Sequence, residues 1–161
     1  LFSVKHGATT IWERWDGWTP QRGFQDPGMN SFNHYSLGSC GEWLFDTVAG
    51  IGLDPKQPAF RHVIVHPRTG GGLTSAGASY ESIRGRIASA WSIKDGHFAL
   101  DVTIPANVTA TVFVPAADAA SVTESGKPAA DAEGVRLLRV QNGEAVFAVQ
   151  SGTYRFASPR K

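Results

Sequence analysis

Hydrophobic and polar residues follow two different periods along the 161-residue chain. Between residues 30 and 52, apolar and small side chains recur at steps of three and four, which predicts one helix over this range. Asn30 or Ser31 can cap the start of this helix through a side-chain oxygen, and Gly52 and Pro55 are typical of a helix end. The apolar stripe carries large aromatic residues and therefore needs partners, yet no second helix of comparable quality is predicted.

From about residue 60 apolar and polar residues alternate, which predicts short β-strands. The clearest strand is 98–104, where Phe98 and every second residue after it are apolar, and Pro105 ends it. Turn sequences such as Asn142-Gly143 separate the other segments. About eight or nine strands at this spacing predict an antiparallel β-sandwich. The expected strands are 62–67, 79–85, 86–93, 98–104, 109–115, 120–125, 134–140, 144–149 and 152–156.

Residues 5–29 fit neither pattern, because repeated glycine and proline residues interrupt any long helix. We therefore expect a loop that leads into the helix. Within it, GATTIWERWDGW (residues 7–18) places three of the chain's five tryptophans around Glu13. Indole rings can exclude water from a carboxylate, and they can form a wall for the apolar face of a sugar. A glutamate framed by tryptophans, close to a histidine at a helix start, suggests carbohydrate chemistry.

A simpler interpretation of the same stretch stays open. The three tryptophans, which are spaced by three residues, could form a core stripe, and Glu13 could pair with Arg14 or Arg22.

Composition and charge exclude several classes of protein. Fifteen basic and fourteen acidic side chains leave a formal charge of +1, without the basic excess typical of nucleic-acid binders. The sequence has no run of about 18 apolar residues, so no membrane span is predicted. The N-terminus shows no signal-peptide pattern; it lacks Met and begins in mid-pattern, which suggests a piece of a longer chain. The single cysteine, Cys40, excludes an internal disulfide and is expected to be a buried helical residue.

Two motifs resemble a known family of glycoside hydrolases. T-x-W-E-x-W at residues 10–15 and M-N-S-x-N-H-Y at residues 29–35 are similar to the C-terminal end of the catalytic domain in the inverting α-L-rhamnosidases. The β-rich part of the chain resembles that family's C-terminal domain. The resemblance implies a mixed α and β fold: residues 1–57 form the C-terminal segment of a six-hairpin α/α toroid, and residues 58–161 form a jelly-roll-like antiparallel β-sandwich.

The resemblance also implies roles for individual residues. Glu13 matches the general base, which activates a water molecule against the anomeric carbon. His34 matches a histidine that contacts the bound rhamnose, and Trp12 and Trp15 are expected to wall the pocket. The implied substrate is a rhamnose-containing glycoside, and no cofactor, nucleic acid or membrane partner is expected.

The general acid of the family is a glutamate far upstream, in an acidic motif that this chain lacks. Asp26, Glu42 and Asp46 are poor substitutes, because Asp26 is expected in a turn and the other two at solvated helix positions. We therefore expect the remaining N-terminal part of the catalytic domain to supply the acid, and the 161-residue chain alone to be inactive.

Two other functions remain possible. One is a glycosidase built on the same toroid that acts on a different sugar. The other is a non-catalytic β-sandwich, either carbohydrate-binding or structural, with residues 1–52 as a docking arm. His62 and His66 lie four residues apart on a predicted strand, but two ligands without a third do not predict a metal site.

Overall fold

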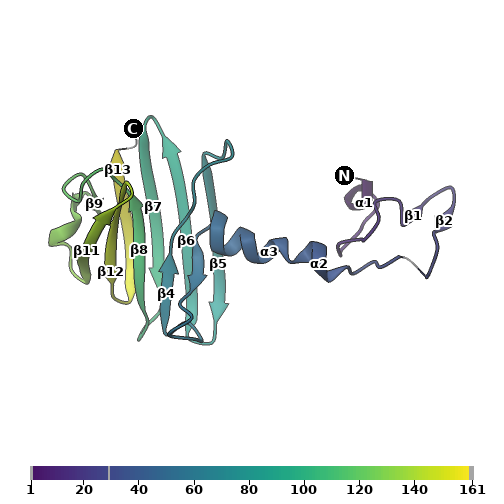
Figure 1. Ribbon diagram of the computed structural model, residues 1–161, viewed down its shortest axis with the longest axis horizontal. Helices are drawn as coiled ribbons and strands as arrows, with labels where there is room; N and C mark the ends of the chain where they lie inside the picture. The colour runs from purple at the N-terminus through teal and green to yellow at the C-terminus, as the bar shows by residue number, and fades with distance from the viewer. Residues whose placement is uncertain (1, 29, 160–161) are drawn as a thin grey trace. The chain divides into compact units, whose positions relative to one another are not determined.

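The computed structural model describes residues 2–28 and 30–159. The chain divides into two compact units, Leu1–Trp43 and Leu44–Lys161 (Figure 1). The predicted domain boundary after residue 57 remains a prediction about the domains of a longer protein.

The unit Leu1–Trp43 is mostly loop, as predicted for residues 5–29. Its only sheet within the described residues is an antiparallel pair, in which Trp18 is opposite Phe24. The elements of this unit are α1 (Phe2–Lys5), β1 (Trp18–Thr19), β2 (Gly23–Phe24), α2 (Tyr35–Gly38) and α3 (Cys40–Trp43).

The predicted continuous helix over residues 30–52 is wrong in its bounds. Residues 30–34 are not helical, and the helical run consists of α2, α3 and the π-helical segment η1 (Leu44–Val48). It ends before Gly50, whose φ of +80° suits glycine and breaks the helix, so Gly50 rather than Gly52 is the stop. Gly52 lies in strand β3 (Ile51–Leu53), because pairing with β4 (His62–Val65) prevails over local helical periodicity there.

The α2 and α3 parts of this helical run carry exposed apolar side chains, whereas η1 packs against β3. Tyr35, Leu37 and Trp43 are all exposed. Cys40 was expected to be buried and is exposed. The physical reason is that no second helix in the described residues covers α3.

The unit Leu44–Lys161 contains two β-sheets. One has six strands in the order β10-β9-β13-β7-β6-β5, and the other has five in the order β11-β12-β8-β4-β3. Figure 1 shows the strands of both sheets lying roughly along one axis, with their arrows pointing both ways. The remaining elements are β4 (His62–Val65), β5 (Ser75–Ser82), β6 (Gly85–Lys94), β7 (His97–Ile104), β8 (Thr109–Pro115), β9 (Thr123–Glu124), β10 (Lys127–Pro128), η2 (Ala129–Asp131), β11 (Val135–Gln141), β12 (Glu144–Val149) and β13 (Gly152–Pro159).

Both sheets contribute side chains to one hydrophobic core. Phe147 from the five-stranded sheet and Phe156 from the six-stranded sheet are fully buried, and their ring centroids lie 5.6 Å apart. Alternate residues of β7 and β8 point into the same core. The structure therefore confirms a mixed fold dominated by antiparallel sheets.

One strand pair departs from the antiparallel prediction. β4 and β8 are parallel, with His62 opposite Thr109 and Val65 opposite Val112. The chain leaves the five-stranded sheet after β4, forms β5, β6 and β7 in the other sheet, and returns beside β4. Such a crossover is a long-range feature that strand periodicity does not reveal.

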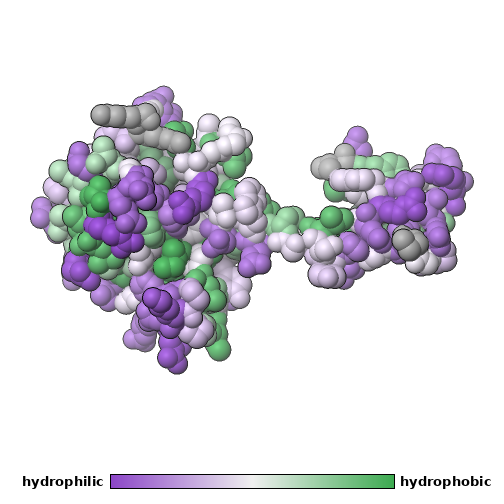
Figure 2. Space-filling view, in the orientation of Figure 1, coloured by the Kyte–Doolittle hydropathy of each residue, from purple (hydrophilic) through white to green (hydrophobic). Residues whose placement is uncertain are grey.

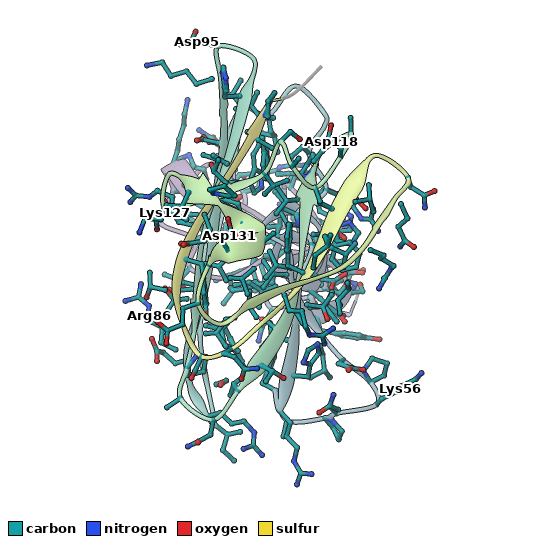
Figure 3. The ribbon with its side chains drawn as sticks, turned by 90° about the vertical axis from the view of Figure 1, so that its left-hand side faces the viewer. Lys56, Arg86, Asp95, Asp118, Lys127 and Asp131 are labelled. Carbon is teal, nitrogen blue, oxygen red and sulfur yellow. The ribbon has the colours of Figure 1, made fainter. Side chains whose placement is uncertain are left out.

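The surface of the unit Leu44–Lys161 mixes polar and apolar side chains (Figure 2). Charged residues mark both ends of the sheets: Figure 3 shows Asp95, in the turn between β6 and β7, at the opposite end from Lys56, in the loop between β3 and β4. Among the described residues, no helix has the length and apolar character needed to cross a bilayer.

Candidate functional site

Backbone hydrogen bonds join the two sequence motifs in space. The Glu13 N–H donates to the Ser31 carbonyl at 2.8 Å, and the His34 N–H donates to the Ile11 carbonyl at 2.9 Å. The Thr10 hydroxyl also donates to the Phe32 carbonyl. Residues 10–13 and 31–34 therefore lie side by side, although about twenty positions separate them in the sequence.

The carboxylate of Glu13 faces His34. Its Oε2 accepts the Ser31 backbone N–H at 2.9 Å and lies 4.0 Å from Nδ1 of His34. The second distance is too long for a direct hydrogen bond but allows a shared ligand or water. The two side chains are 32% and 31% exposed, so both reach solvent in this chain. The structure thus brings together the predicted base and the predicted sugar contact.

Neighbouring arginines do not pair with Glu13. Arg14 and Arg22 place nitrogen atoms 3.5 Å and 3.6 Å from the carboxylate of Asp16. The simpler interpretation, in which Glu13 neutralises one of these arginines, is therefore wrong. Asp16 takes that role, and Glu13 stays directed at Ser31 and His34.

The tryptophans of the first motif have different environments. Trp12 is half-buried, and its ring meets Phe32 edge-on at a centroid distance of 5.1 Å. Phe24 meets the same Phe32 ring at 5.3 Å, so aromatic contacts brace the strip that carries Ser31. Trp15 is 73% exposed and is not part of a core stripe.

One positioning contact was not predicted from the sequence. The Asn30 side-chain amide donates to the Gly17 carbonyl at 2.9 Å. A Cβ atom at Gly17 would lie 2.6 Å from Oδ1 of Asn30, so a larger residue there would displace the Asn30 side chain from this contact. The sequence signal for this contact is the glycine in W-D-G-W (residues 15–18) together with the Asn30 amide of the second motif. Met29 of that motif lies outside the described residues.

The other acidic residues occupy the positions that the sequence suggested. Asp26 accepts the Gly28 N–H at 2.8 Å in a turn, and Glu42 and Asp46 are exposed on the helical run. None of them is brought to Glu13 by a contact in the described part of the chain. The general acid is therefore still expected from elsewhere.

The two histidines of β4 and its end have protein partners. The two ring nitrogens of His62 form hydrogen bonds with the hydroxyls of Thr109 and Thr111 at 2.7 Å and 2.8 Å. Burial lowers the pKa of His62. Nε2 of His66 lies 2.7 Å from Oε1 of Glu144. Residues 2–28 and 30–159 contain no group of three or more His, Cys, Asp or Glu side chains suited to a metal.

Two family models match successive parts of this chain. The bacterial alpha-L-rhamnosidase 6 hairpin glycosidase domain matches residues 1–48. The bacterial alpha-L-rhamnosidase C-terminal domain matches residues 52–129. The first match contains Glu13 and His34, and the second begins inside β3.

Similar proteins agree with these matches. An alpha-L-rhamnosidase of Streptomyces avermitilis is 41% identical over 155 residues, which are 96% of this chain and 14% of the relative. One from Formosa agariphila is 34% identical over 156 residues, 97% of this chain and 17% of the relative. A crystal structure of Streptomyces avermitilis alpha-L-rhamnosidase complexed with L-rhamnose superposes with a TM-score of 0.76 at 40% identity, covering 97% of this chain and 14% of that chain.

The chain therefore belongs to the bacterial α-L-rhamnosidase family, and the resemblance inferred from the two motifs is confirmed. It spans 14% and 17% of the length of the two relatives named above.

Proposed function

We propose that this chain is part of a glycoside hydrolase that removes terminal α-L-rhamnose from glycosides, and that it supplies the general base, Glu13. The observation that carries the proposal is the partly exposed Glu13 carboxylate facing His34 within the stretch matched by the glycosidase domain. The names of the similar proteins favour rhamnose over another sugar.

The geometry around Glu13 suits a base that must be held in one orientation. The Ser31 N–H fixes Oε2, which leaves Oε1 to accept a proton from water. That water attacks the anomeric carbon while the glycosidic C–O bond breaks on the opposite face, and an acid from elsewhere protonates the leaving oxygen. Inverting enzymes of this kind hold their two carboxyl groups roughly 6.5–9.5 Å apart, so that the water fits between base and sugar.

The remaining predicted site residues act on binding. His34 donates or accepts a hydrogen bond with a sugar hydroxyl, and its place beside Glu13 sets the distance between that hydroxyl and the water. Trp12 and Trp15 form walls against the apolar face of the sugar. The exposure of Trp15 in this chain is compatible with a wall that becomes covered when sugar is bound.

The architecture follows the family. Residues 1–57 are the C-terminal segment of the α/α toroid, and residues 58–161 are a jelly-roll-like β-sandwich. The N-terminal part of the catalytic domain is the partner that completes the toroid and brings the general acid. The 161-residue chain by itself is then inactive, so cleavage of a nitrophenyl rhamnoside by this chain, shown free of longer species by mass spectrometry, would contradict the proposal.

Stereochemistry provides the test of the water-activating role. The parent enzyme is mixed with p-nitrophenyl α-L-rhamnopyranoside, and proton NMR follows the anomeric signal before mutarotation. We expect β-L-rhamnose to appear first, with the α anomer growing later. If the α anomer appears first, water does not attack the substrate directly, and Glu13 is not the base of a single displacement.

A further inference from the structure

A polar cleft lies on the outer face of the five-stranded sheet, away from the hydrophobic core. Three neighbouring strands, β11, β12 and β8, and the segment that follows β4 contribute to its lining. Its volume is about 350 Å³, which is enough for one small molecule. The side chains that matter for its chemistry are His66, Arg68, Phe113, Arg139, Gln141 and Glu144.

The floor of the cleft is preorganised by an aromatic stack. The rings of His66 and Phe113 are nearly parallel, at 6°, with centroids 3.8 Å apart. Arg139 lies over the same Phe113 ring, with Cζ 5.9 Å from the centroid. Val146, which is opposite both Phe113 and Arg139 in the sheet, is fully buried, so these side chains cover the strand beneath them.

The charge of the cleft favours an anion. Arg68 and Arg139 contribute two positive charges, against one negative charge from Glu144. Glu144 is held by His66 at 2.7 Å, whereas Nη1 of Arg68 is 4.0 Å from it. Arg68 is therefore not tightly engaged by Glu144, and its side chain is 60% exposed.

Guanidinium groups recognise carboxylates through paired, planar hydrogen bonds. The amides of Gln141 and Asn142 line the same cleft and add neutral donors and acceptors, which suit hydroxyl groups. An apolar ligand would find few partners here. A cleft with arginines, amides and room for one sugar ring suits a sugar acid, which carries a carboxylate and hydroxyl groups.

We propose that this cleft binds the carboxylate of a uronate unit in an acidic glycan. The inference rests on the proposed function in one respect, since it takes the parent protein to act on glycans. It adds a second, non-catalytic sugar site, formed by β8, β11, β12 and the segment after β4, and separate in sequence from Glu13. Arg68 and Arg139 hold the carboxylate, and Gln141 and Asn142 contact the ring hydroxyls.

Equilibrium titration of the parent enzyme with D-galacturonate tests this site. D-galactose has the same ring without the carboxylate, and acetate has the carboxylate without the ring. We expect D-galacturonate to bind at least about tenfold more tightly than either, because both groups contribute contacts. Equal binding of acetate would reduce the cleft to a general anion site, and equal binding of galactose would remove the role of the arginines; either result overturns the proposal.

Substitutions locate the binding. Arg139→Gln and Arg68→Gln should each raise the Kd of D-galacturonate about tenfold, the effect of losing one charge-assisted hydrogen bond. Arg136→Gln is the matched control, since it removes an exposed arginine from the same strand, β11, outside the cleft. Absence of binding, or equal weakening by the control variant, contradicts the proposal. Thermal unfolding of each variant establishes that the fold is kept.

Turnover separates this inference from the proposed function. All three arginine variants should hydrolyse p-nitrophenyl α-L-rhamnopyranoside at the unaltered rate. An enzyme that binds D-galacturonate in the cleft but does not cleave the rhamnoside would remove the proposed function and leave the uronate site. An enzyme that cleaves the rhamnoside but does not bind D-galacturonate would do the opposite.

Discussion

Gly50 is the residue at which an added methyl group should destabilise the unit Leu44–Lys161 most sharply, because two penalties combine there. Its φ is +80°, and its carbonyl accepts the His66 N–H at 2.9 Å. A Cβ atom would lie 2.2 Å from the backbone nitrogen of Pro67 and 2.6 Å from the carbonyl carbon of His66. These are backbone atoms, so no side-chain rotation relieves the overlap.

The magnitude follows from the two terms. Placing alanine in the left-handed region costs about 1 kcal/mol. Forcing a methyl group into packed backbone adds about 1–3 kcal/mol. Gly50→Ala should therefore lower the free energy of unfolding by about 2–4 kcal/mol, a large part of the 5–15 kcal/mol typical of a domain.

A matched glycine isolates the steric term. Gly71 has a φ of +60°, but a Cβ there meets nothing within 4 Å, so Gly71→Ala should cost only about 1 kcal/mol. Urea unfolding of both variants can be followed through Trp91, which is 2% exposed and is the tryptophan of this unit. If the two variants lose equal stability, the overlap between Gly50 and Pro67 has no energetic weight and the reasoning fails.

Two further predictions concern histidines. His34→Ala in the parent enzyme should raise KM for the rhamnoside about tenfold with a smaller change in kcat, because Ser31 still positions Glu13; a loss confined to kcat would contradict this. Burial lowers the pKa of His62 below 6.5, so the unfolded chain takes up the proton first. The free energy of unfolding should therefore fall as pH drops below 6.5. In the His62→Gln variant the urea midpoint should depend less on pH between 7 and 5; an equal pH dependence in both proteins would refute the prediction.

Local patterns predicted the β-rich part well, and long-range contacts account for the errors. Strand β7 was predicted from alternation alone, since each residue's face follows from its neighbours in the sequence. The predicted helix end at Gly52 is wrong because Gly52 pairs with Ile64 of β4, twelve positions away, which local helical periodicity does not reveal. The parallel pairing of β4 with β8 depends on a return from the other sheet, which no local pattern encodes.

The candidate site shows the same division. The motifs named Glu13 and His34, and the structure places them 4.0 Å apart. Only the structure shows that the Ser31 backbone N–H orients the Glu13 carboxylate and that Asp16 forms the ion pairs with the arginines. Both contacts join residues by geometry rather than by residue type.

The role of Glu13 is tested most directly by kcat of the Glu13→Gln variant in the parent enzyme. Glutamine keeps the shape and an oxygen for the Ser31 N–H but cannot take a proton, so kcat should fall about 10²–10⁴-fold with little change in KM. Asp26→Asn is the control, an exposed carboxylate in the same unit, and should stay within about twofold of the unaltered enzyme. A Glu13→Gln enzyme with unaltered kcat and a raised KM would show that Glu13 binds sugar and activates no water.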